Sequence, residues 1–108
     1  MKYKSKSTIV DGVAFASKKE AGRYLKLKEL EKNKKITNLE LQPAFILQES
    51  FTRDNKKYRP IIYIADFRYI EDGKTIVEDV KGFKTPEYRL KKKILLYKYH
   101  GFEFKEIK

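Results

Sequence analysis

Cysteine is absent from the 108 residues, and His100 is the only histidine. These gaps exclude disulfides, Cys-based zinc sites, thiol nucleophiles, His-rich metal sites and His-dependent triads. No segment is apolar for long enough to cross a membrane, and no apolar run follows the basic N-terminus. We therefore expect no secretory signal, no membrane partner and a cytoplasmic location. Any catalysis must come from carboxylates, Lys, Arg, Tyr or Ser.

Negative charge is also scarce, because 26 Lys and Arg face 15 Asp and Glu, for a formal net charge of +11. Such a balance favours a polyanionic partner, with nucleic acid the first candidate and an anionic membrane the second. Ribosomal and chromosomal proteins are just as basic, so charge alone predicts binding and not catalysis. Apolar residues make up 41% of the chain, which is enough for one compact core, and we expect residues 1–108 to form a single domain.

Turn and capping signals organise the N-terminal third of the chain. Residues 1–10 are expected to form a basic arm, and Asp11-Gly12 marks a turn before a short strand. Ser17 can cap a helix that runs to about residue 34, with Glu20 as its capping-box partner. Helical spacing then predicts five apolar contact positions on this helix: Ala21, Tyr24, Leu25, Leu27 and Leu30.

The remainder alternates between strand and helix patterns. A β pattern begins at Ile36, and Thr85 can cap a second helix that Gly101 ends. Further strands are expected over residues 44–51, 58–70, 75–81 and 102–107. The order β-α-β-β-β-β-α-β predicts an α/β (α+β) fold, in which one mixed sheet is flanked by two helices.

A hairpin around Asp72-Gly73 is expected to place two aspartates opposite each other. Asp-Gly suits a two-residue type I′ turn, in which Glu71 faces Lys74 and the numbers of paired residues sum to 145. Asp66 and Asp79 are then partners, with Cβ atoms roughly 4.5–5.5 Å apart. A three-residue loop would shift this register by one residue.

Two like charges at paired positions destabilise a sheet, and a divalent cation between them removes the conflict. Mg²⁺ prefers hard oxygen ligands, often one or two carboxylates with water and phosphate oxygens. Lys81 follows Asp79 by two residues and shares its face, where the register pairs it with Ile64. As alternatives, Asp66 could cap a strand end or be neutralised by Arg68, and Asp79 could pair with Lys81 across the surface.

A strand Asp, a turn and Asp-x-Lys on the next strand, followed by a helix, resemble the core of the PD-(D/E)xK nuclease superfamily. Here the motif is Ala65-Asp66 and then Asp79-Val80-Lys81, with Ala65 in place of the proline. In detail the chain resembles a family of small phage and prophage proteins long listed as a domain of unknown function. Four stretches carry this likeness: residues 15–20 (FASKKE), 41–43 (LQP), 63–67 (YIADF) and 77–82 (VEDVKG).

The resemblance implies a restriction-endonuclease-like fold and a Mg²⁺-dependent endodeoxyribonuclease, with Mn²⁺ able to substitute. Asp66 and Asp79 would bind the metal, and the Val80 carbonyl would help. Lys81 would orient or activate the attacking water and stabilise negative charge in the transition state.

Three polar residues around this motif need separate interpretations. Glu20 matches the acidic residue on the first helix of many superfamily members, although its capping role needs no catalysis. Glu78 alternates to the face opposite Asp79, so Asp79 is the expected metal ligand. Gln42 stands at a strand end before Pro43 and is a candidate to point into the site and contact nucleic acid.

The basic residues on the two helices and the loop after the motif are candidates for phosphate contacts, although a solvated helix face is the alternative for each. If they bind DNA together, the binding should weaken steeply with salt. The candidates are Lys18, Lys19, Arg23, Lys84, Lys91, Lys92 and Lys93.

Among superfamily members, Holliday-junction resolvases are small, basic single domains that act as dimers on branched DNA. The resemblance therefore implies a structure-selective endonuclease from a phage or prophage, acting as a homodimer. Two other classes stay open: a nucleic-acid-binding module without activity, and a basic structural protein of a phage particle. Sequence-specific nicking or restriction is a further possibility within the enzyme class.

Overall fold

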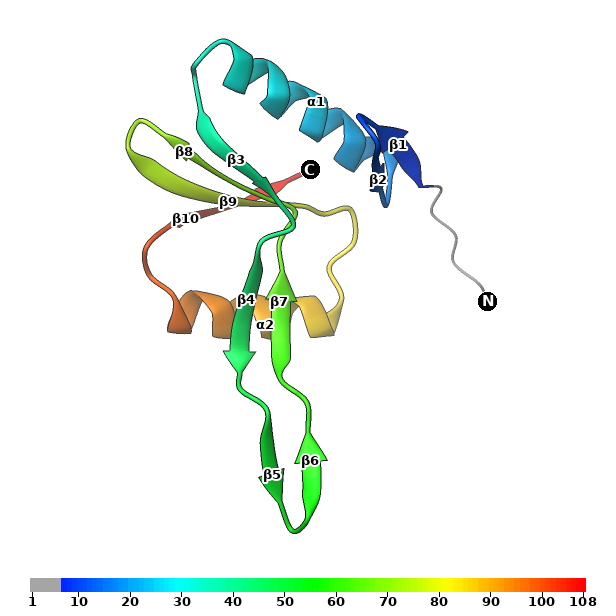
Figure 1. Cartoon of the computed structure of the whole chain (residues 1–108), viewed down its shortest axis with the longest axis vertical. Helices are drawn as coiled ribbons and strands as arrows, with labels where there is room; N and C mark the ends of the chain where they lie inside the picture. The colour runs from blue at the N-terminus through cyan, green and yellow to red at the C-terminus, as the bar shows by residue number, and fades with distance from the viewer. Residues whose placement is uncertain (1–6) are drawn as a thin grey trace.

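A four-stranded mixed sheet lies at the centre of the fold (Figure 1). The computed structural model describes residues 7–108, and residues 1–6 of the predicted basic arm lie outside the described residues. The strand order is β10-β9-β8-β3, with β10 parallel to β9 and the other neighbours antiparallel. These strands are β3 (Thr37–Leu41), β8 (Phe67–Glu71), β9 (Lys74–Val80) and β10 (Glu103–Ile107). The predicted mixture of helices and a mixed sheet is confirmed.

The helices α1 (Lys18–Lys32) and α2 (Pro86–Lys98) lie on opposite sides of this sheet (Figure 1). Both predicted N-caps are confirmed, since Ser17 Oγ accepts from the Glu20 N–H at 3.1 Å and Thr85 Oγ1 accepts from the Tyr88 N–H at 3.0 Å. Within residues 7–108, neither helix is long and apolar enough to span a membrane.

Each helix packs over its own apolar core. Ile76 and Val77 are adjacent in β9 but belong to different cores, because successive side chains of a strand point to opposite faces. Leu25 was predicted to contact the core, but it is 52% exposed and lies outside it. The core under α1 contains Phe15, Ala21, Tyr24, Leu27, Ile36, Phe67, Tyr69 and Ile76, and the core under α2 contains Phe45, Leu47, Tyr63, Ala65, Val77, Tyr88 and Leu95.

A long antiparallel ribbon runs from the sheet past α2 and beyond it (Figure 1). The half of the ribbon nearer the sheet is β4 (Ala44–Gln48) paired with β7 (Ile61–Ile64). The far half is β5 (Phe51–Arg53) paired with β6 (Lys56–Tyr58). Two hydrogen bonds connect this ribbon to the β3–β8 pair: Gln42 N–H to the Asp66 carbonyl at 2.9 Å, and Ala65 N–H to the Pro43 carbonyl at 3.0 Å. The prediction of one strand over 58–70 was therefore wrong, because the strand is interrupted at Pro60 and again at Asp66.

Tight turns of one kind close the hairpins of the described region. Positive φ angles at both central residues, as the type I′ turn requires, occur at Asp11-Gly12, Asp54-Asn55 and Asp72-Gly73. The first of these turns joins β1 (Thr8–Val10) to β2 (Val13–Phe15). Residues 8–10 are therefore strand rather than part of an N-terminal arm, which corrects that prediction.

Candidate active site

The β8–β9 hairpin brings Asp66 and Asp79 to neighbouring positions. Glu71 pairs with Lys74 and Phe67 with Glu78, which confirms the predicted register. Asp66 lies one residue before β8, and its backbone N–H donates to the Glu78 carbonyl at 3.0 Å. The two aspartates therefore sit one step beyond the last paired residues, where the ribbon bends away from the sheet.

The Asp66 carboxylate contacts groups from two elements. Its Oδ2 accepts a hydrogen bond from the Val80 N–H at 2.6 Å. Burial raises the pKa of Asp66 to about 6, the Val80 hydrogen bond opposes this rise, and the nearby Glu20 carboxyl adds to it. Val80 thus meets Asp66 through its amide, and a role for its carbonyl as a metal ligand stays a prediction.

Glu20 lies in the first turn of α1, between the helix cap and Asp66. Its backbone N–H is capped by Ser17, while its side chain accepts from the Ala16 N–H at 3.5 Å instead of from Ser17, as a complete capping box would require. The same carboxyl lies close enough to Asp66 to raise the pKa of that aspartate. The first turn of α1 therefore brings a further acidic group next to Asp66.

Asp79 is almost completely buried, with 1% of its surface exposed. The Tyr63 hydroxyl donates to its Oδ2, and Lys81 Nζ lies 4.0 Å from its Oδ1. Burial raises the pKa of Asp79 to about 6, although the Lys81 charge acts against that rise. Asp79 is thus a buried carboxylate that has a tyrosine hydroxyl and a cationic side chain beside it.

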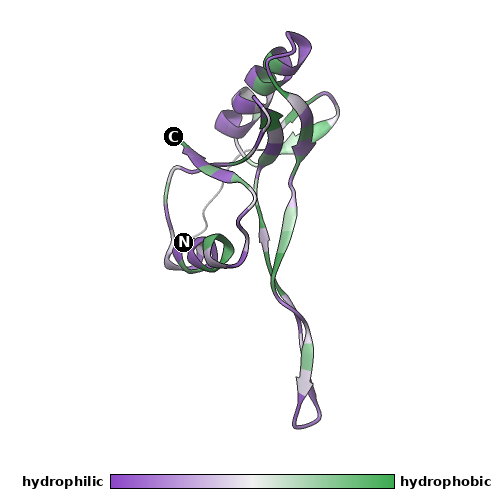
Figure 2. Ribbon diagram, turned by 90° about the vertical axis from the view of Figure 1, so that its left-hand side faces the viewer, coloured by the Kyte–Doolittle hydropathy of each residue, from purple (hydrophilic) through white to green (hydrophobic). Residues whose placement is uncertain are grey.

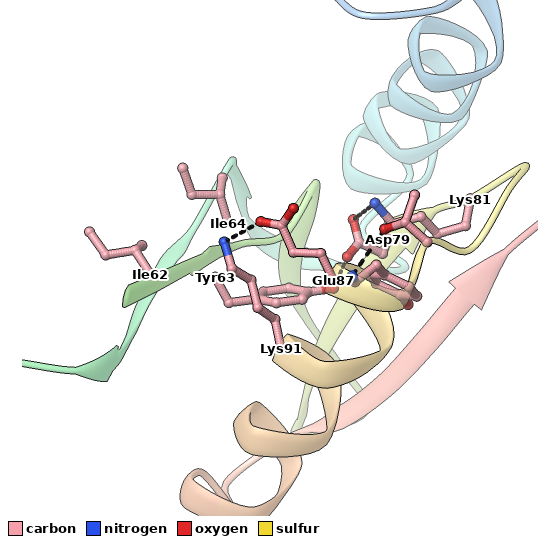
Figure 3. Close-up of a pocket in the computed structure, with 9 residues that line it drawn as sticks. Ile62, Tyr63, Ile64, Asp79, Lys81, Glu87 and Lys91 are labelled. Carbon is pink, nitrogen blue, oxygen red and sulfur yellow. Dashed lines mark hydrogen bonds and ion pairs between the residues drawn. The ribbon is translucent and has the colours of Figure 1, made fainter. Parts of the chain in front are cut away.

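Lys81 stands between two clefts. One cleft contains Asp79 and runs along Ile62 and Ile64 of β7 toward α2 (Figure 3). The other lies between the first turn of α1, including Glu20, and the loop after β9. Lys81 Nζ also lies 4.5 Å from the centre of the Tyr88 ring, a cation–π contact that limits where the ammonium group can go.

The predicted pairing of Lys81 with Ile64 was wrong. The Lys81 N–H donates to the Ile107 carbonyl at 2.9 Å, and Ile64 pairs with Ala44 in the β4–β7 ribbon. The reason is the interruption at Asp66: the residues before it pair with β4, and only the residues after it pair with β9. Lys81 and Ile64 nevertheless line the same cleft.

Glu78 faces away from Asp79, as strand alternation predicted. It is fully buried and forms a bidentate ion pair with Arg23 of α1, and the Tyr69 hydroxyl donates to it. Arg23 was a candidate for phosphate contacts, but its guanidinium is committed to this ion pair and its side chain is only 24% exposed. Glu78 and Arg23 therefore have a structural task under α1.

The other predicted contact residues differ in how free they are. Lys18 and Lys19 are exposed, and Lys19 lines the cleft beside Glu20. Three lysines hold acidic partners: Lys84 and Lys92 pair with Glu106 at 2.9 and 3.0 Å, and Lys91 pairs with Glu87 at 3.2 Å. Gln42 is exposed, and its backbone, in a left-handed conformation with φ 52°, donates to the Asp66 carbonyl.

Sequence reasoning missed two tyrosines and a glutamate. Tyr63 contacts Asp79 from β7, and Tyr88 donates from its hydroxyl to Glu106 at 2.5 Å. This hydrogen bond, with the lysines around Glu106, lowers the pKa of Glu106 to about 2. The alternation of β7 places Tyr63 between two exposed isoleucines and so predicts that it is buried, but no local signal identifies Asp79 as its partner.

A family model matches the whole chain, from residue 1 to residue 108. The chain belongs to the DUF1064 family. The family is described as a protein of unknown function, so membership by itself assigns no activity. Searches of the curated proteins and of the solved structures found no match. The chemistry of this DUF1064 protein must therefore be inferred from its own residues.

The donor set at the aspartates fits a hard divalent cation. Among residues 7–108, no group of three or more His, Cys, Asp or Glu side chains is arranged to hold a metal ion. Mg²⁺ does not need one, because it is often bound through one or two carboxylates and keeps several waters. Asp66 and Asp79 are two hard oxygen donors whose charged forms burial disfavours, and a cation would offset that cost.

Proposed function

We propose that this DUF1064 protein is a Mg²⁺-dependent endonuclease of the PD-(D/E)xK type that hydrolyses the DNA backbone, with Mn²⁺ able to replace Mg²⁺. One observation carries the proposal. Asp66 and Asp79 sit at neighbouring positions where the sheet bends, burial raises the pKa of each to about 6, and Lys81 lies 4.0 Å from Asp79. Burying two like charges side by side costs free energy, and a divalent cation bound between them would offset the repulsion.

Hydrolysis joins a water oxygen to phosphorus, breaks the bond from phosphorus to one sugar oxygen, and gives that oxygen a proton. Mg²⁺, when bound, supplies positive charge at the phosphate and lowers the pKa of a water. Asp66, Asp79 and the Val80 carbonyl would hold the cation. Lys81 orients the attacking water and stabilises the negative charge that develops on the phosphate, and Glu20 accepts a hydrogen bond from water beside Asp66.

The net charge of +11 suits a DNA substrate, and the exposed Lys18 and Lys19 stand next to Glu20. We further propose that the enzyme selects branched DNA, because its small size and basic charge resemble those of Holliday-junction resolvases. A homodimer would bring two such sites to two strands in the cytoplasm of a bacterial host.

The test is cleavage of labelled four-way junction, flap, nicked, single-stranded and linear duplex DNA in Mg²⁺, Mn²⁺ or EDTA. The wild type is compared with Asp79→Asn and with Asp72→Asn, a matched control that makes the same chemical change at the turn of the same hairpin. We expect metal-dependent cutting of branched DNA by the wild type and the control, and none by Asp79→Asn.

Two other outcomes would change the proposal. Equal cutting of every substrate would keep the active site and remove the selectivity for branched DNA. Tight DNA binding without cutting in any metal would overturn the nuclease function and leave a nucleic-acid-binding module.

A further inference from the structure

Residues 49–60, here called the β-arm, extend from the body of the molecule in both views (Figures 1 and 2). The β-arm consists of β5, β6, the turn at Asp54-Asn55 and the residues that join it to β4 and β7. Within the described part of the chain, β5 and β6 pair only with each other, and every residue of the β-arm is exposed. The β-arm therefore adds nothing to either apolar core.

The β-arm is nevertheless built to hold its shape. An isolated two-stranded hairpin is marginally stable in water, so local contacts must support it. Phe51 and Tyr58 are cross-strand partners whose rings stack with centroids 4.7 Å apart and planes 11° apart. Asp54 and Asn55, with φ of 52° and 62°, form the turn that matches the twist of the strands. An ordered element that stabilises no core is suited to contacts outside the chain.

The charge of the β-arm points to a polyanion. From Phe51 to Arg59 the only acidic side chain is Asp54, against four basic ones: Arg53, Lys56, Lys57 and Arg59. Among residues 7–108, none of these four forms an ion pair.

Two of these basic residues conflict within the hairpin itself. Arg53 and Lys56 are direct cross-strand partners, an arrangement that destabilises a hairpin on its own. They share a face with the Phe51–Tyr58 stack, since strand positions two apart point the same way. Bound phosphates would remove the repulsion, and the neighbouring aromatic rings would add apolar contact with sugars or bases.

The greatest reach of the β-arm from the aspartates is about one repeat of DNA. The tip residue Asn55 precedes Asp66 by 11 residues. At about 3.3 Å per strand residue, the tip lies at most roughly 36 Å from Asp66 along the ribbon. One turn of B-DNA is about 34–36 Å, and its major groove, about 12 Å wide, admits a two-stranded ribbon. The cleft at Asp79 is lined by β7, which leads directly into the β-arm.

We propose that the β-arm lies in the major groove of duplex DNA and holds it about one helical turn from the phosphate that is cleaved. The groove contact stands on the charge and shape of the β-arm, and the position of the cut rests on the proposed function. Two requirements follow. Loss of the basic residues should weaken duplex binding, and cleavage should need duplex that extends as far as the tip.

Binding is measured in the Asp79→Asn background with a labelled duplex of about 30 base pairs at several salt concentrations. The arm variant carries Arg53→Gln, Lys56→Gln and Lys57→Gln. The matched control carries Lys26→Gln, Lys32→Gln and Lys35→Gln on or just after α1, so that both proteins lose three exposed positive charges. We expect the arm variant to bind about tenfold more weakly or worse, with a salt slope smaller by about three, and the control to change little.

Cleavage is then measured with Asp79 restored in every protein, on substrates whose duplex continues about 6 or about 14 base pairs past the cut. The wild type should prefer the longer duplex, and the arm variant should cut both lengths at the same low rate. A second variant, Lys57→Gln with Arg59→Gln, leaves Arg53, Lys56 and the aromatic stack unchanged and checks that any loss does not come from unfolding of the β-arm. Thermal unfolding monitors the body of each protein.

The failure of this proposal differs from the failure of the proposed function. Equal DNA binding by the arm variant and the control would overturn the groove contact, even if the wild type cleaves DNA. Unchanged DNA binding together with weaker self-association in sedimentation would overturn it too, and would assign the β-arm to a protein partner. Arm-dependent binding without cleavage in any metal would keep the groove contact and overturn the nuclease.

Discussion

Arg23 of α1 and Glu78 of β9 form a bidentate ion pair, with Nε–Oε1 at 2.8 Å and a second N–O contact at 2.5 Å. The pKa of Arg23 is raised, chiefly by its hydrogen bonds to Glu78. The pair fixes α1, which carries Glu20, against β9, which carries Asp79. The acidic groups of the candidate site therefore reach one another partly through a contact on the opposite face of the sheet.

This ion pair gives a way to separate Glu78 from Asp79. Removing one partner of a buried pair leaves an uncompensated charge and costs about 3–5 kcal/mol. Because Arg23 is 24% exposed, we expect Glu78→Gln to lower the free energy of unfolding by about 3 kcal/mol, at the lower end of that range. Cleavage well below the melting temperature should stay within a few-fold of wild type. Denaturant unfolding and a cold cleavage assay measure the two effects, and lost cleavage with unchanged stability would assign Glu78 to the site.

The elements predicted correctly from the sequence depend on neighbours in the chain. Ser17 and Thr85 cap helices because a hydroxyl reaches an N–H three residues ahead, and Asp72-Gly73 sets the register of β8 and β9 because its turn allows one pairing. These local rules were enough to bring Asp66 near Asp79, although the pairing of β8 with β9 ends at Phe67 and Glu78.

The features that could not be predicted from the sequence depend on which strand each segment pairs with. Residues 58–70 look like one strand in the sequence. Nothing local shows that the segment pairs with β4 before Asp66 and with β9 after it. The Tyr63–Asp79 hydrogen bond and the cleft along β7 both depend on this change of partner strand. The closeness of the two carboxylates could be predicted from the sequence, but the shape of the surface around them could be described only from the structure.

The stability of the metal-free protein should rise as the pH falls from about 7.5 to about 5.5. Asp66 and Asp79 have pKa values of about 6 in the fold, against the ordinary 3.8 of an unfolded chain. The folded state therefore binds more protons between these values, and its stability is lost as the pH rises through 6. Urea midpoints in EDTA should show this trend for the wild type, and a flatter one for the double variant Asp66→Asn with Asp79→Asn. Identical profiles for the two proteins would contradict the raised pKa values.

Lys81→Met should separate catalysis from metal binding. Lys81 lies 4.0 Å from Asp79 but donates no ligand oxygen, so the variant should keep the rise in melting temperature that Mg²⁺ or Mn²⁺ causes. Loss of a group that stabilises transition-state charge should reduce the cleavage rate by about 10²–10³. Lys32→Met, at an exposed lysine at the end of α1, is the matched control and should cleave normally. Normal cleavage by Lys81→Met would remove this residue from the mechanism.

Glu106→Gln tests whether Lys84 and Lys92 contact DNA. Glu106 holds both lysines and the Tyr88 hydroxyl, and these hydrogen bonds lower its pKa to about 2. The depressed pKa contributes stability above the ordinary value of 4.5, and that stability is lost as the pH falls through about 2. The variant should therefore be less stable than wild type at pH 7, with a difference that shrinks in strong acid.

The same substitution frees two ammonium groups from their acidic partner. If they reach phosphates, Glu106→Gln should bind duplex DNA several-fold more tightly at low salt, with a salt slope larger by up to about two. The triple variant Glu106→Gln, Lys84→Gln and Lys92→Gln should lose that gain. Unchanged DNA binding with lower stability at pH 7 would instead show that Lys84 and Lys92 hold β10 against α2 and do not contact the substrate.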